Sequence, residues 1–179
     1  NDFASLGGGT VGFDVNTLGG DDSITVDGTT IGGDVTAGAG NDTVRINSGE
    51  VGGTISVGAG DDLLDINPTG ALVLGTVHDF EGDIGDDTIL IQGGDLTGRD
   101  IFGDDAGGIG VDGNDSIVVS GGTMDNISGE GGNDTIRVSA GTINVQVLGG
   151  DGDDLLAFTG GSIGDDIRAG DGENTITVG

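Results

Sequence analysis

The chain has 179 residues and a mass of 17.3 kDa, and 43 of the residues are glycine. Its 32 acidic residues stand against only four arginines, which gives a formal net charge of −28. This charge excludes a nucleic-acid-binding protein, because phosphate contacts need clustered Lys and Arg. The absence of cysteine excludes a disulfide scaffold and thiolate metal sites. No apolar run is long enough to span a membrane, and a mean hydropathy of +0.02 argues against disorder.

An Asp/Asn-Asp dipeptide recurs along the whole chain at nearly constant spacing. Its copies begin at Asn1, Asp21, Asn41, Asp61, Asp86, Asn114, Asn133 and Asp153, and Glu173-Asn174 is a degenerate ninth copy. The steps between the copies are 20, 20, 20, 25, 28, 19, 20 and 20 residues. A fixed period of this length is typical of solenoid repeats, in which each unit is one supersecondary element.

Apolar residues occupy fixed positions after each dipeptide. Two and four residues after its second member, the sequence reads Ala4 and Leu6, Ile24 and Val26, Val44 and Ile46, Leu64 and Ile66, Ile89 and Ile91, Ile117 and Val119, Ile136 and Val138, Leu156 and Phe158, and Ile176 and Val178. This alternation predicts a short strand with one buried face. Two further apolar columns predict a second short strand: Val11, Ile31, Val51, Ala71, Leu96, Met124, Ile143 and Ile163, then Val15, Val35, Ile55, Val147 and Ile167.

A unit of 20 residues with two short strands cannot bury its own apolar face, but stacked units can. The sequence therefore predicts an all-β fold, a two-sided parallel β-solenoid of about nine coils, forming a single domain over residues 1–179. The longer steps predict loops inserted in coils 4 and 5, near Pro68–Asp83 and Arg99–Gly113. Helical repeats are excluded, because they need longer units and far less glycine.

A nine-residue pattern precedes each apolar run. Its fullest copy, Gly149–Ala157, reads GGDGDDLLA and matches the calcium-binding nonapeptide G-G-x-G-x-D-x-U-x. The chain thus resembles the RTX proteins, secreted bacterial proteins that bind calcium in a parallel β-roll, and the resemblance runs along nearly its whole length. RTX repeats are direct tandems with calcium turns on both edges, whereas here only one corner of each coil carries the motif. We therefore expect one file of calcium ions along one edge, and no regular carboxylate at the other corner.

The resemblance implies calcium ligands at the sixth and fourth positions of each copy. The aspartates are Asp2, Asp22, Asp42, Asp62, Asp87, Asp115, Asp134 and Asp154, and the glycines are Gly20, Gly40, Gly60, Gly85, Gly113, Gly132 and Gly152. Stacking alone also favours a cation, because it repeats these carboxylates at about the strand spacing of 4.8 Å. Oxygen ligands in a flexible glycine turn suit Ca²⁺ better than Mg²⁺. With Asn174 in the Asp position, the last site is expected to be weak.

Several functions remain open at this level. A structural rod in a surface layer, adhesin, matrix or filament is favoured over an RTX secretion and folding module of a secreted enzyme or toxin, and over an ice-binding solenoid. No enzyme is expected, because the single His78 has no Ser or Cys partner evident from spacing and the arginines, interpreted as outward strand residues, are scattered. We expect secretion to the cell surface, no membrane insertion, and head-to-tail self-association or continuation into a longer solenoid, since both end coils carry core residues and no polar cap.

Overall fold

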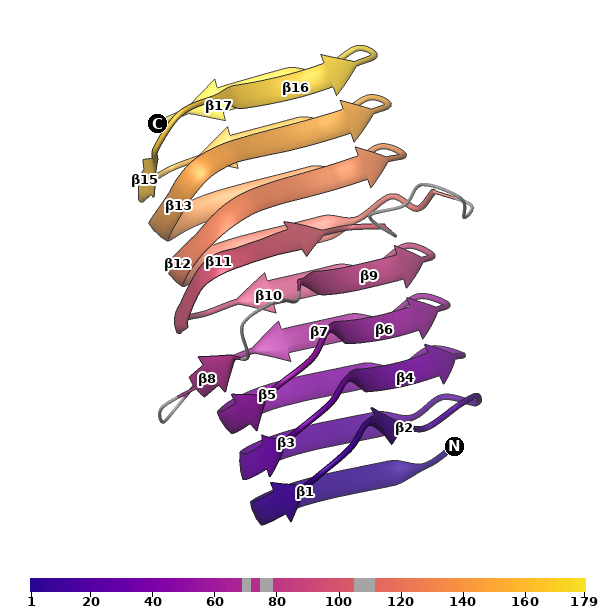
Figure 1. Cartoon of the computed structure of the whole chain (residues 1–179). Helices are drawn as coiled ribbons and strands as arrows, with labels where there is room; N and C mark the ends of the chain where they lie inside the picture. Colours follow the sequence, from indigo (N-terminus) through magenta and orange to yellow (C-terminus); the bar gives the residue numbers. More distant parts are fainter. Residues whose placement is uncertain (69–71, 75–78, 105–111) are drawn as a thin grey trace.

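The chain forms a parallel β-solenoid that climbs one strand spacing per coil, from the N-terminus at the bottom of Figure 1 to the C-terminus at the top. The structure is a computed structural model, and it describes residues 1–68, 72–74, 79–104 and 112–179. No helix occurs in these ranges, and so none that is long and apolar enough to cross a membrane. The predicted all-β solenoid is confirmed.

The strands fall into two stacks that form the two faces of the solenoid. The first strands of successive coils are β1 (Phe3–Val11), β3 (Ser23–Ile31), β5 (Thr43–Val51), β7 (Leu63–Ile66), β10 (Thr88–Ile91), β12 (Ser116–Gly131), β13 (Thr135–Asp151), β14 (Leu155–Phe158) and β17 (Thr175–Val178). The returning strands are β2 (Val15–Asn16), β4 (Val35–Ala39), β6 (Ile55–Ala59), β9 (Phe80–Ile84), β11 (Asp95–Phe102) and β16 (Ile167–Asp171), and β12 and β13 continue into this face. Short strands β8 (Leu72–Leu74) and β15 (Ser162–Ile163) lie on the narrow edge between the faces (Figure 1).

Every pair of neighbouring strands is parallel, and its register joins equivalent positions of the repeat, apart from local shifts in the pairs β3–β5, β11–β12 and β12–β13. Ile24 pairs with Val44, and Ile136 pairs with Leu156, one period later. The nine first strands therefore enclose eight complete turns. Because the register equals the period, each sequence column becomes a column of stacked side chains in space.

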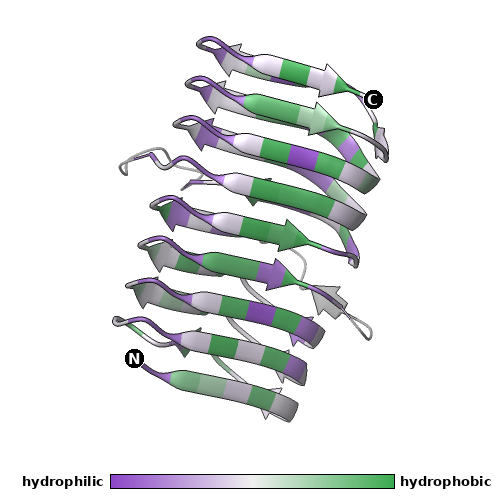
Figure 2. Ribbon diagram, turned by 180° about the vertical axis from the view of Figure 1, so that it is seen from behind, coloured by the Kyte–Doolittle hydropathy of each residue, from purple (hydrophilic) through white to green (hydrophobic). Residues whose placement is uncertain are grey.

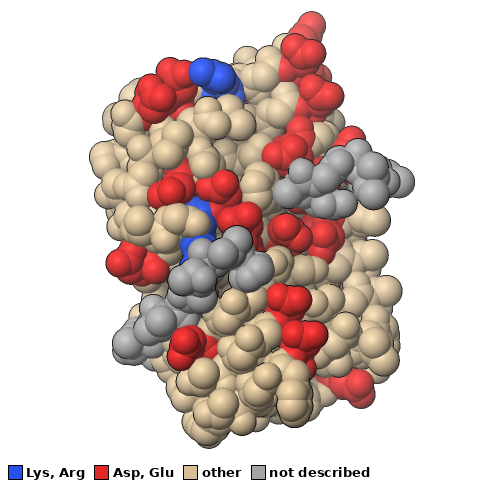
Figure 3. Space-filling model, viewed as in Figure 1, with Lys and Arg blue, Asp and Glu red and all other residues tan. Residues whose placement is uncertain are grey.

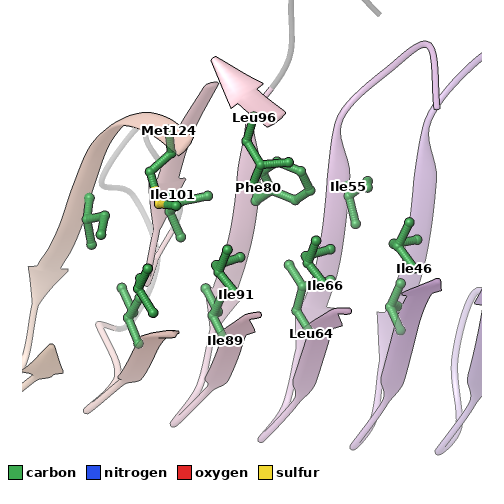
Figure 4. Close-up of a cluster of buried hydrophobic side chains, with 14 of the residues drawn as sticks. Ile46, Ile55, Leu64, Ile66, Phe80, Ile89, Ile91, Leu96, Ile101 and Met124 are labelled. Carbon is green, nitrogen blue, oxygen red and sulfur yellow. The ribbon is translucent and has the colours of Figure 1, made fainter. Parts of the chain in front are cut away.

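The core is a thin double layer of aliphatic side chains between the two faces. Inward residues such as Ile46, Leu64 and Ile66 are completely buried (Figure 4). Outward residues of the same strands are more polar, so green and pale bands alternate along the rungs in Figure 2. The returning face also buries Phe80, Ile101 and Ile127, which continue the column of Ile55.

The two insertions are narrower than the sequence suggested. Phe80–Ile84 pairs in register with β6, and Asp100–Phe102 pairs in register with β12. Both segments thus belong to regular coils. The first predicted loop extended too far at its C-terminal end, and the second extended too far at its N-terminal end. Ala71 and His78 lie outside the described residues.

Not all arginines face solvent as expected. Arg45 is exposed, with its Nε 3.3 Å from an Asp65 carboxylate oxygen, and Arg168 lies 2.6 Å from Asp166. Arg99, in contrast, is only 7% exposed and donates to the carbonyl oxygen of Gly98 at 3.2 Å. The interpretation of Arg99 as an outward residue was wrong, because it lies in the coil whose insertion obscures the repeat.

A pair of adjacent leucines provides a test of this register. Leu64 points into the core and is fully buried, whereas Leu63 points outward. Replacing Leu64 with alanine should lower the free energy of unfolding by about 2–5 kcal/mol, because it leaves a cavity. Leu63→Ala, the matched control, should cost much less. Denaturant unfolding followed by circular dichroism would measure both, and equal losses would contradict the register.

Candidate metal centre

The second residue of each Asp/Asn-Asp dipeptide lies inside the corner where the returning strand turns into the next coil. These residues form a column that we call the inner ladder: Asp2, Asp22, Asp42, Asp62, Asp87, Asp115, Asp134, Asp154 and Asn174. In each step the backbone N–H of one coil donates to the side-chain Oδ1 of the next. The N···O distance is 2.6 Å from Asp22 to Asp42 and 2.8 Å from Asp134 to Asp154. The carboxylates thus replace backbone carbonyls as acceptors where the strand ends.

The first residues of the dipeptides form an outer ladder on the exposed side of the same corner. Its hydrogen bonds run along the rod in the direction opposite to those of the inner ladder. Here the N–H of a later coil donates to the side-chain oxygen of the coil before it. Asp21 donates to Asn1 at 2.8 Å, and Asp153 donates to Asn133 at 2.7 Å. Asn and Asp alternate freely in this ladder, because an amide oxygen accepts as well as a carboxylate. The two ladders together explain why the dipeptide recurs.

The inner aspartates retain an oxygen that the ladder does not use. The Oδ2 atoms of Asp22, Asp42, Asp62, Asp87, Asp115, Asp134 and Asp154 are buried and have no hydrogen-bond partner among the described residues. These side chains are at most 4% exposed. At the last rung, Asn174 accepts the Asp154 N–H at 2.7 Å, so a neutral amide satisfies the same geometry. The charge of the other rungs is therefore not needed for the ladder itself.

Burial raises the pKa of every inner aspartate from Asp42 to Asp154 above its ordinary value. The pKa reaches about 9 at Asp87, about 8 at Asp134, about 7 at Asp115 and about 6 at Asp62. Asp22 differs, because the Asp2 N–H lowers its pKa. The pKa values of Asp87 and Asp134 lie above neutral pH, so these two carboxyls favour the protonated form in the metal-free protein.

Glycines at the fourth motif position let the chain turn around the inner ladder. Gly20, Gly40, Gly60, Gly85, Gly132 and Gly152 have φ between +105° and +137°, which other residues rarely adopt. Gly113 does not have a positive φ. The expectation that every motif glycine allows a left-handed turn was therefore wrong for Gly113. A Cβ at Gly113 would nevertheless clash with the carbonyl oxygen of Gly85. At all seven positions the motif glycines are sites of close contact between coils.

A second column, on the returning strands, faces the inner aspartates across the corner. Its members are Thr17, Ala37, Val57, Gly82, Gly103, Gly129, Gly149 and Ala169. At the four glycines, a Cβ would lie within 2.7 Å of two oxygens. One is the free Oδ2 of the inner aspartate, and the other is the carbonyl oxygen of the next residue in the column. We call this column the facing column, and each of these four places where two oxygens converge beside a glycine a glycine cradle.

The donors available here fit a hard cation. Among the described residues, no three His, Cys, Asp or Glu side chains lie close enough together to hold a metal ion by themselves. A cation in this corner would therefore combine an inner carboxylate with backbone carbonyl oxygens, an oxygen-only set of the kind that Ca²⁺ accepts. The orphaned Oδ2 atoms and the cradles both fit such an ion.

Two acidic features of the structure were missed in the sequence. Asp104 is buried, and its carboxylate accepts the N–H groups of Gly113 at 3.0 Å and Gly131 at 3.3 Å. Burial raises its pKa to about 6. It sits beside the insertion of the longest coil, where the repeat spacing gave no signal for it.

The corner that precedes the returning strands also carries carboxylates, so the expectation that they recur at one corner alone was partly wrong. The Asp34 N–H donates to Asp14 at 3.0 Å, and the Asp100 N–H donates to Asp79 at 3.0 Å. Thr54 interrupts this column, which hid it in the sequence. These carboxylates are more exposed than the inner ladder, and none of their oxygens is buried and unpaired.

No family model matches the chain, and the comparisons with curated proteins and with solved structures also give no match. The case for a metal centre therefore depends on the geometry of the corner. Figure 3 shows acidic side chains, in red, along the edge formed by these turns.

The raised pKa values predict how the metal-free protein responds to pH. Between about pH 4 and pH 9 the folded chain holds protons that the unfolded chain has released, so its stability falls as the pH rises. We expect the metal-free chain to be more folded at pH 5.5 than at pH 8.5, measured by far-UV circular dichroism.

Asp87→Asn provides the control, because asparagine keeps the Oδ1 acceptor and removes the charge. The metal-free variant should be more stable than the original chain at pH 8.5, and its pH dependence should be weaker. An identical pH dependence of the two proteins would contradict the assignment of the raised pKa to the inner ladder.

Proposed function

We propose that the protein is a calcium-binding structural solenoid of the RTX type, a rod that calcium makes rigid outside the cell. The observation that carries this proposal is the row of seven buried, unpaired aspartate oxygens along one edge. Without cations, each of these oxygens costs free energy in the folded state, since buried charges need a partner. A calcium ion between coils supplies such a partner and links the two coils on either side of it.

The large negative net charge of the chain supports a site of action where calcium is abundant. A chain with a net charge of −28 and a thin core has little to hold it together without cations. Calcium sites of extracellular modules bind at about 10⁻⁴–10⁻³ M. Such sites stay empty in a low-calcium cytosol and fill outside the cell. This behaviour suits a component of a surface layer, adhesin, matrix or filament.

Calcium-dependent folding is the direct test. At pH 8 in EGTA, the chain should be largely unfolded, and millimolar CaCl₂ should induce β-structure cooperatively, because the folded state alone binds the ions. Far-UV circular dichroism would follow the titration, with MgCl₂ as the matched control. A β spectrum that is unchanged in excess EGTA would refute the proposal.

The end coils support a second part of the proposal, that a further coil covers each end. Ile176 and Val178 occupy core columns and yet are 48% and 75% exposed. At the other end, Ala4 and Leu6 are only partly buried in the equivalent columns. A further coil would continue both the core and the inner ladder. That coil is supplied either by continuation of the solenoid or by another copy that stacks head to tail, a contact that need not close into a ring.

Assembly of this 179-residue segment should depend on calcium if copies stack head to tail. Light scattering should then detect rods that lengthen in millimolar calcium and shorten after chelation. The variant Val178→Asp, which places a charge in the exposed end layer, should remain short. A strictly monomeric particle at high concentration in calcium would refute head-to-tail stacking of copies.

A further inference from the structure

We propose that calcium binds only in the C-terminal half of the rod, at four sites, and that the facing column decides where. The inference rests on the proposed calcium function and states which aspartates of the inner ladder bind the ions. The inner ladder repeats almost without change from Asp22 to Asp154, so its own sequence does not divide the rod. The facing column does divide the rod, because it changes from side chains to glycines between Val57 and Gly82.

In the C-terminal half, the facing-column glycines let two oxygens converge at the position where other residues carry a Cβ. At Gly129, a Cβ would lie within 2.5 Å of both the Asp134 Oδ2 and the Gly149 carbonyl oxygen. The same pair of atoms recurs at Gly82, Gly103 and Gly149, each with its own inner aspartate and the next carbonyl. These glycines are not in the left-handed region of φ, so backbone conformation does not require glycine there. Space does.

In the N-terminal half, side chains fill the same column. Ala37 and Val57 are completely buried at the positions equivalent to the cradles. Beside Asp22, whose facing residue is Thr17, the equivalent carbonyl oxygen is that of Ala37, and it already accepts the Thr17 hydroxyl at 2.7 Å. Beside Asp42 and Asp62, a side chain thus occupies the position that glycine leaves to the two oxygens. Asp42 and Asp62 therefore act as ladder acceptors and not as cation ligands.

Additional acidic residues at the turn follow the same division. The position directly after the facing column is Leu18, Gly38 and Gly58 in the first three coils, then Asp83, Asp104 and Glu130, and finally Gly150 and Gly170. One residue further, Gly19, Ala39, Ala59 and Ile84 give way to Asp151 and Asp171 in the last coils. In Figure 3 the acidic side chains on this edge are denser over its upper, C-terminal part. Negative charge thus accumulates where the cradles are.

The number of bound ions tests the inference on the whole chain. Native mass spectrometry and calorimetry in CaCl₂ should both give four calcium ions per chain. Seven ions, one for each unpaired Oδ2, would overturn the restriction to one half and leave the proposed function intact. No bound ion at all would overturn both.

Matched isosteric variants locate the sites. Asp134→Asn should reduce the count from four to three, whereas Asp42→Asn should leave it at four, because both keep the Oδ1 acceptor and only Asp134 faces a cradle. Equal loss from the two variants would refute the inference.

Substitutions in the facing column test its role directly. Gly129→Ala fills a cradle and should also remove one ion, and Gly12→Ala, at an open surface position, is its control. Ala37→Gly creates space beside Asp42 and should raise the count toward five. Circular dichroism in calcium would verify that each variant folds, and an unchanged count in a folded Gly129→Ala variant would refute the role of the cradle.

Discussion

Parallel stacking in register places every residue directly above its own equivalent, one strand spacing away. A column of isoleucines is stabilised by this arrangement, because each added side chain buries the previous one. A column of carboxylates is destabilised, since at an effective dielectric constant of 20 two neighbouring charges repel by about 3 kcal/mol. The hydrogen bonds of the inner ladder use one oxygen of each carboxylate. The other oxygen, from Asp22 to Asp154, is buried and has no hydrogen-bond partner among the described residues.

The contrast between the two ladders separates structural from chemical requirements. Both ladders satisfy backbone N–H groups at the same corner. The outer ladder is exposed and accepts asparagine and aspartate alike, as Asn41 and Asp61 illustrate. The inner ladder is buried, where asparagine would cost less, and yet it is aspartate at every rung before Asn174. A charge that the hydrogen bonds do not need, kept where it is most expensive, favours the proposed role of the C-terminal rungs as cation ligands.

Much of this architecture could be predicted from the sequence, because a fixed period converts directly into register. The columns of Ile24 and Val26 and the position of the aspartates needed only alignment of the repeats. The facing column could not be recognised, since threonine, alanine, valine and glycine share no apolar or polar pattern. Its role becomes evident only in the structure, where the Oδ2 of Asp134 lies across the corner from Gly129. Asp104 and Phe80 were missed for a simpler reason, that the insertions shift them away from their expected spacing.

The two insertions leave the inner ladder undisturbed. The Asp62 N–H donates to Asp87 across a step of 25 residues and the Asp87 N–H donates to Asp115 across a step of 28, both at 2.8 Å, as in coils of regular length. Extra residues are thus accommodated within a coil without altering the contact between coils. Duplication of a coil changes the length of the rod, whereas insertion within a coil changes only its surface. Under selection, these two properties can evolve independently.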